Sequence, residues 1–88
     1  MARYHLNIRN GNGFTADDEG MDLSSIDHAR QEAIRGARSL LSAEVLEGKL
    51  DLNGQIEVTD DDSACILTVR FVEAVDVHPL DNSASLDR

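Results

Sequence analysis

The chain has 88 residues, with 17 Asp or Glu against 8 Lys or Arg, and a formal net charge of −9 at pH 7. This length predicts a single domain over residues 1–78 that is only just large enough to fold alone, so we expect dimerisation to add stability. The negative charge disfavours nucleic acid and anionic lipid as partners, and the lack of a roughly 20-residue apolar run or of a basic-then-apolar leader predicts a cytoplasmic protein with no membrane segment.

The first predicted element is a strand over residues 3–9, where apolar and polar side chains alternate as on a strand with one wet face. The apolar positions are Tyr4, Leu6 and Ile8, and the polar ones are Arg3, His5, Asn7 and Arg9. The Asn-Gly-Asn-Gly sequence at 10–13 has the turn chemistry of a hairpin. A shorter strand is expected at 14–17, with a further piece at 21–23 after an acidic turn.

Residues 25–47 predict one amphipathic helix, the only helix of the chain. Ser24 or Ser25 can cap its first turn, Asp27 suits the helix dipole there, and Gly48 is a plausible left-handed stop. The apolar arc consists of Ile26, Ala29, Ala33, Ile34, Gly36, Ala37, Leu40 and Leu41. Because the centre of this arc is made of small residues, the helix backbone should lie close to a sheet.

Two charged residues project into the apolar arc of the helix. The stem of Arg30 is expected to lie along the edge of the core with its charged group in water. Glu44 predicts that the last turn bends away from the sheet or overhangs it. A partner could cover that overhang.

The second half of the chain predicts another hairpin. Residues 55–59 alternate with Ile56 and Val58 inward, the acidic turn at 60–63 follows, and the chain returns over 64–71. The inward side chains of the return strand are Cys65, Leu67, Val69 and Phe71. Val75 and Val77 are spaced as on a strand. They predict either that the last strand continues to this point or that a short extra strand forms. The remaining residues, 79–88, lack periodicity and predict a disordered tail.

These elements predict an α+β fold of order β-β-α-β-β, an antiparallel sheet of about four strands with one helix packed on one face. No repeat beyond the two hairpins and no linker divides the chain.

Sequence motifs for catalysis and metal binding are absent. The histidines, His5, His28 and His78, lack the spacing of a zinc site, and the acidic turn at 60–62 does not match a calcium-binding loop. Cys65 alternates with inward residues, so we expect a buried structural thiol. No phosphate-binding glycine loop, GxSxG elbow or HExxH motif occurs. We therefore expect no enzyme, no cofactor, and no catalytic or metal-binding residues.

The wet face of the sheet is the predicted interaction surface. Its candidate residues are Arg3, His5, Asn7, Arg9, Thr68 and Arg70. Either they are ordinary solvated positions, or they form a cationic docking face for an acidic segment, a phosphate or a second copy of the chain. The edge strands offer a second way to bind a partner, by pairing with one of its strands.

Four stretches carry a family resemblance: RYHLNIRNGNG, DDEGMDL, IDHARQEAIRGARSLL and LNGQIEVTDDDSACILTVRF. In this order they resemble an uncharacterised family of short alphaproteobacterial proteins, known as a domain of unknown function, over about residues 3–77. The resemblance implies a small α+β protein of the bacterial cytoplasm. It brings no known activity or catalytic residues.

A weaker likeness is to the amino-terminal half of HicB-type antitoxins, in which a strand hairpin precedes an alanine-rich helix opened by an acidic residue. The matching segments here are residues 4–8, 14–17 and 27–41. Our leading hypothesis is a non-enzymatic protein-interaction module, expected to be a homodimer. The alternative is a HicB-like toxin-neutralising or regulatory protein, for which the acidic charge suits a small basic partner.

Overall fold

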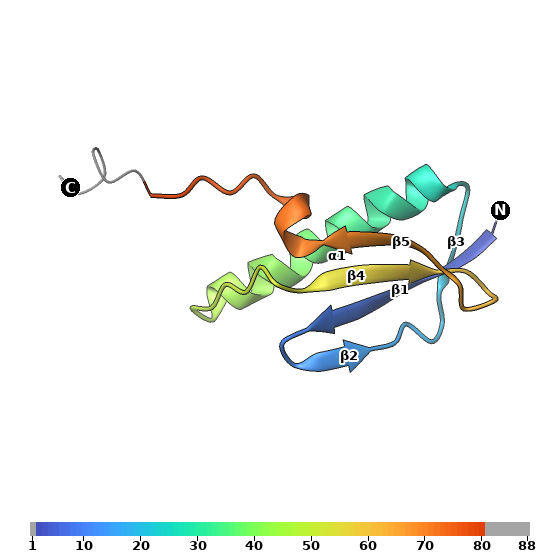
Figure 1. Cartoon of the computed structure of the whole chain (residues 1–88), viewed down its shortest axis with the longest axis horizontal. Helices are drawn as coiled ribbons and strands as arrows, with labels where there is room; N and C mark the ends of the chain where they lie inside the picture. The colour runs from blue at the N-terminus through green and yellow to red at the C-terminus, as the bar shows by residue number, and fades with distance from the viewer. Residues whose placement is uncertain (1, 81–88) are drawn as a thin grey trace.

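The computed structural model describes residues 2–80 and contains one long helix on one face of an antiparallel sheet (Figure 1). In chain order the elements are β1 (Ala2–Asn10), β2 (Gly13–Thr15), β3 (Met21–Leu23), α1 (Ile26–Leu46), β4 (Gln55–Thr59), β5 (Cys65–Arg70) and the 3-10 helix η1 (Phe71–Ala74). The predicted α+β fold is confirmed. No helix within the described range is long and apolar enough to cross a membrane.

The long strand β1 lies inside the sheet, whose order is β2-β1-β4-β5. On one side β1 pairs with β4, from His5 opposite Thr59 to Arg9 opposite Gln55. On its other side it pairs first with β3 and later with β2. The residues between β2 and β3, 16–20, leave the ladder. The predicted interruption of the second strand is therefore confirmed, and the loop that it creates covers the middle of the β1 edge.

The ends of α1 follow the predicted capping chemistry. The Ser25 hydroxyl accepts a hydrogen bond from the His28 backbone N–H at 3.1 Å, and Gly48 after the helix has a φ of 83°. Ala29, Ala33 and Ala37 are fully buried against the sheet. These small residues let the helix backbone lie close to the strands, as the sequence predicts.

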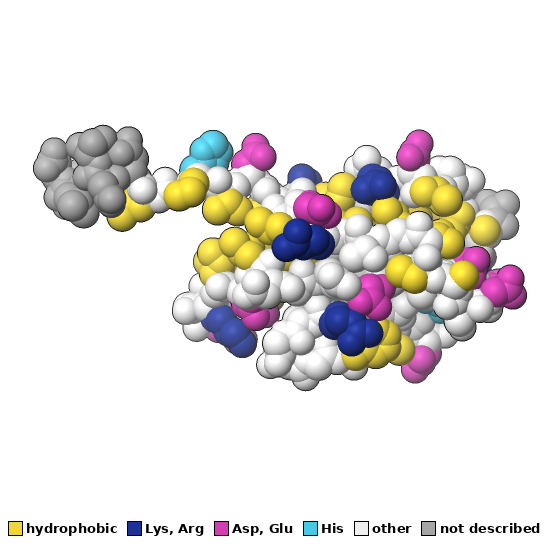
Figure 2. All heavy atoms as spheres, in the orientation of Figure 1, with side chains coloured by type: hydrophobic (Ala, Val, Ile, Leu, Met, Phe, Trp, Pro, Cys, Tyr) yellow, Lys and Arg dark blue, Asp and Glu magenta, His cyan; other side chains and the backbone are white. Residues whose placement is uncertain are grey.

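The helix is longer than the strands β4 and β5 on which it packs. Its 21 residues span about 31 Å, whereas the five residues of β4 span about 17 Å. Ile26, expected on the buried arc, is 49% exposed in the first turn, and Val45 and Leu46 are 55% and 86% exposed at the other end. Figure 2 shows hydrophobic side chains gathered at that end, where the C-terminal segment leaves the body. The predicted overhang of the last turn agrees with these exposures.

The chain after β5 departs from the prediction. Instead of continuing as a strand through Val75 and Val77, it turns into η1, and no further strand follows up to residue 80. The Phe71 backbone N–H donates to Gly54 at 2.9 Å and its ring packs on Gly54, which buries Phe71. Arg38 Nε donates to the Ala74 carbonyl at 2.7 Å, which ties η1 to the helix.

Cys65 is also placed differently from the prediction. The ladder between β4 and β5 shifts by one residue after Val58, so Thr59 lies opposite Cys65 rather than Ile66. A one-residue shift moves a side chain to the other face of the sheet. Cys65 is consequently exposed on the open face of the sheet. The prediction that its thiol is buried is wrong.

Of the predicted tail at 79–88, the structure describes Pro79 and Leu80, and both are exposed. The rest of that prediction lies outside the described residues.

Candidate functional site

The loop at 16–20 is held against β1 by the side chain of Asp17. Its carboxylate accepts a hydrogen bond from the Leu6 backbone N–H at 3.0 Å and another from the Gly20 backbone N–H at 3.1 Å. The first of these bonds takes the place of a missing strand partner at the β1 edge. Asp17, a residue of a local turn, therefore supplies the hydrogen-bond acceptor that a neighbouring strand would otherwise provide.

Asn7 joins this loop to the centre of the sheet. The residue is 7% exposed, and its side-chain oxygen accepts from the Asp17 backbone N–H at 2.9 Å. Its Nδ2 group donates to the Glu57 carbonyl at 3.1 Å and to Thr59 Oγ1 at 3.2 Å. Asn7 was expected to be a wet surface residue, yet it is a buried and fully engaged polar group.

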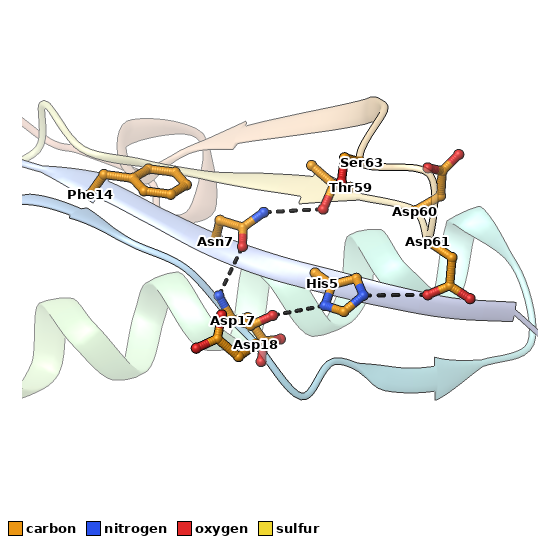
Figure 3. Close-up of a pocket in the computed structure, with 9 residues that line it drawn as sticks. All are labelled: His5, Asn7, Phe14, Asp17, Asp18, Thr59, Asp60, Asp61 and Ser63. Atoms are coloured by element: carbon orange, nitrogen blue, oxygen red, sulfur yellow. Dashed lines mark hydrogen bonds and ion pairs between the residues drawn. The ribbon is translucent and has the colours of Figure 1, made fainter.

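His5 lies between the loop and the tip of the β4-β5 hairpin (Figure 3). Its Nδ1 atom is 2.7 Å from the Asp17 carbonyl oxygen, and its Nε2 atom is 3.4 Å from a carboxylate oxygen of Asp61. The hydrogen bond to the Asp17 carbonyl raises the pKa of His5 above its usual 6.5, burial opposes the rise, and Asp61 adds to it.

Around these groups the open face is hollowed by a cavity of about 380 Å³. Its lining combines aspartates with small polar groups and one aromatic ring: His5, Asn7, Phe14, Asp17, Asp18, Thr59, Asp60, Asp61 and Ser63. We call this cavity the acidic hollow. The aspartates come from two loops more than 40 residues apart in the chain, and Figure 3 shows them on either side of His5. A cavity lined in this way favours a positively charged group.

The acidic hollow does not have the geometry of a metal site. Within residues 2–80, no three His, Cys, Asp or Glu side chains are arranged so that they could hold a metal ion. One oxygen of Asp60 accepts hydrogen bonds from the Asp62 and Ala64 backbone N–H groups at 2.9 and 3.0 Å. Asp60 therefore also shapes the hairpin tip.

Two arginines of the predicted interaction face, Arg3 and Arg9, are engaged with neighbouring groups. Arg9 Nε donates to Glu57 at 2.7 Å, and its guanidinium lies 4.7 Å from the centre of the Phe14 ring. This ion pair lowers the pKa of Glu57 and raises that of Arg9. Arg3 binds the Glu19 carbonyl and forms an ion pair with Asp22 at 3.4 Å. The positive charges of Arg3 and Arg9 are thus balanced by carboxylates of the same chain.

The other predicted face residues lie apart from the acidic hollow. Thr68 and Arg70 are exposed on β5, and neither lines the cavity. The structure therefore brings His5 and Asn7 into one site and leaves Arg3, Arg9, Thr68 and Arg70 outside its lining. The residues that sequence reasoning missed are Asp17, Asp18, Asp60 and Asp61, which read locally as solvated turns.

A second cavity lies at the overhanging end of α1. It has a volume of about 430 Å³ and an apolar lining that includes Leu41, Val45, Leu50, Leu52, Val75 and Val77. We call it the apolar groove. Exposed Leu46 and Leu80 lie on nearby segments of the chain, so this end of the molecule presents several uncovered aliphatic side chains.

The chain matches the model of a known protein family. Residues 3–72 match the family described as Domain of unknown function (DUF6894), which covers β1 through the first residues of η1. The chain belongs to this family. The matched region contains every residue that lines the acidic hollow, and the apolar groove extends beyond it to His78. The chain matches no curated protein and no solved structure.

This membership confirms the predicted resemblance to a family of unknown function, over a slightly shorter range than the expected 3–77. The alphaproteobacterial origin and the likeness to HicB-type antitoxins stay predictions.

Proposed function

We propose that the chain is a non-enzymatic protein-interaction module that binds a basic segment of a partner protein in the acidic hollow. The observation that supports this proposal is the convergence of aspartates from two distant loops around one cavity. No Lys or Arg in the described part of the chain forms an ion pair with any of them. Their negative potential is therefore available to a cation from outside.

The charge of the whole chain points to the same class of partner. A net charge of −9 attracts basic proteins over a distance of about 10 Å at moderate salt, and repels other acidic proteins. The Phe14 ring and the small polar groups of the cavity would contact the stem and the polar atoms of an inserted Lys or Arg. Such a complex should weaken as salt is added.

The proposal is tested by pull-down of the tagged chain from a nuclease-treated lysate of the native host, followed by mass spectrometry. The variant carries Asp18→Asn with Asp61→Asn, and the control carries Glu47→Gln with Asp76→Asn, the same charge change at exposed sites away from the hollow. We expect the wild type and the control to retain a basic protein. The hollow variant should bind it roughly tenfold more weakly, as the loss of two exposed charges implies.

Two results would contradict the proposal: the absence of any stoichiometric basic partner, and equal binding by the hollow variant and its control. A HicB-like toxin-neutralising protein is one form of the proposed function, in which the basic partner is a toxin. An adjacent gene for a small basic protein would support that form.

Self-association is the second candidate, and the apolar groove favours it. Uncovered aliphatic side chains on Val45, Leu46, Leu50 and Val77 are 49% to 86% exposed, which is the type of surface that a second copy would bury. Because both copies carry a charge of −9, the dimer should strengthen with salt. A basic partner in the acidic hollow would show the opposite salt dependence.

We expect Leu46→Glu to convert a dimeric wild type into a monomer, since Leu46 is 86% exposed and would be buried by the second copy. Light scattering after size-exclusion chromatography measures the mass directly. The matched control is Ile26→Glu at the other end of the helix, where Ile26 is 49% exposed, and it should stay dimeric. A monomeric wild type would remove this candidate.

A further inference from the structure

We propose that His5 is a proton-operated latch, which when protonated ties Asp61 at the tip of the β4-β5 hairpin to β1 across the acidic hollow. The effect of this latch on a partner depends on the function proposed above. The latch itself is a property of the isolated chain and is tested without a partner.

The acceptors on the two sides of the ring define the latch. The Asp17 carbonyl oxygen, 2.7 Å from Nδ1, can only accept a hydrogen bond, so Nδ1 must carry a proton. In the neutral imidazole Nε2 then has a lone pair, which faces the Asp61 carboxylate at 3.4 Å. Two acceptors cannot bond to each other. The contact with Asp61 becomes a charge-assisted hydrogen bond only when Nε2 also gains a proton.

The ring is held in place, so protonation changes the contact rather than the position of the imidazole. A methyl group built on Gly20 would lie 2.9 Å from Cε1 of His5, which means that the ring packs directly on the glycine backbone. Gly20 has a φ of 69°, a conformation that side chains with a Cβ rarely adopt. The His5 side chain is only 21% exposed, whereas Asp61 is 68% exposed. Asp61 is therefore the less constrained partner of this contact.

Every titratable group that lines the cavity with His5 is a carboxylic acid. Asp17 and Asp18 face it from the 16–20 loop, and Asp60 and Asp61 face it from the hairpin. Of these, the carboxylates of Asp17 and Asp61 favour the imidazolium form. The pKa of His5 is raised, with the bond to the Asp17 carbonyl as the largest cause. The latch is consequently closed at pH values below this raised pKa and opens as the pH rises through it.

Closure should reduce the attraction of the hollow for a basic segment. The imidazolium adds a positive charge inside the cavity, and its bond to Asp61 occupies one of the carboxylates that a Lys or Arg would use. Acidification would therefore release a basic partner, and a rise in pH would allow it to bind.

The test is nuclear magnetic resonance of the ¹⁵N-labelled imidazole across pH 5 to 9 on the isolated chain. We expect neutral His5 to carry its proton on Nδ1. We also expect its titration midpoint to fall in Asp61→Asn, which removes the charged acceptor. The control is Asp62→Asn, which removes the same charge one residue away, outside the lining of the cavity, and should leave the midpoint near that of the wild type.

Closure of the hairpin is read from hydrogen exchange of the Ser63 and Ala64 amides, corrected for the intrinsic effect of pH. Protection should be roughly twofold to fivefold greater with His5 protonated than with His5 neutral, the range of an exposed ion pair. Asp61→Asn should abolish this difference and Asp62→Asn should keep it. A neutral His5 protonated on Nε2, or identical behaviour of the two variants, would overturn the latch. Loss of binding by the hollow variant in the pull-down, by contrast, concerns only the proposed function.

Discussion

Phe71→Ala should lower the free energy of unfolding by about 3 to 5 kcal/mol, the usual cost of removing a buried phenylalanine ring. Phe71 is 1% exposed and is one of the few large side chains that are fully buried in the described structure. The chain, with 88 residues, is just above the size below which a single core rarely supplies more than about 5 kcal/mol. We therefore expect the variant to be largely unfolded at 37 °C, as measured by circular dichroism during urea titration.

The chain offers a matched control for this prediction. Phe14→Ala removes the same ring from a residue that is 50% exposed, and it also removes the contact with Arg9. Its cost should be about 1 kcal/mol or less. Equal destabilisation by the two substitutions would mean that η1 does not pack on the core as described.

Asp17→Ala should lower the free energy of unfolding by about 2 to 3 kcal/mol, because hydrogen bonds to a charged acceptor are the costly ones to lose. The substitution leaves the backbone N–H groups of Leu6 and Gly20 without their acceptor. Hydrogen exchange measures the effect at each site. Both amides should lose protection, and the acidic hollow should lose its ordered wall.

Asp18→Ala is the control, since the neighbouring aspartate is exposed and accepts no hydrogen bond within the described residues. Its effect on stability should be within about 0.5 kcal/mol. Asp17→Asn retains one acceptor oxygen and should lie between the two alanine variants. If Asp17→Ala and Asp18→Ala behave alike, the carboxylate of Asp17 does not support the β1 edge.

Much of the fold could be predicted because its signals are local. The alternation of Tyr4, Leu6 and Ile8 defines the inner face of β1, and Ser25 and Gly48 mark the two ends of α1. The small residues of the helix predict its close packing on the sheet. Each of these signals is contained within a few neighbouring residues, where backbone propensity and capping act directly.

The failures share a different cause. Cys65 alternates correctly with Leu67, but a shift in the pairing with β4 reverses its face. Val75 has strand spacing, but the packing of Phe71 on Gly54 turns the chain into a 3-10 helix before that point. In both cases a contact with a distant segment overrides the local pattern.

The candidate site shows most clearly the difference between what local sequence signals predict and what contacts between distant segments decide. Alternation along β1 placed His5 and Asn7 on the open face of the sheet, and the turn residues at 16–20 and 60–63 were recognised as turns. That the two turns meet across His5 depends on the pairing of β1 with β4 and on the loop that covers the other edge of β1. Local propensity determines which segments are strands, helix and turns. Only the long-range pairing of strands decides which turns share a surface, because the free energy of that pairing lies in contacts between residues about 50 positions apart.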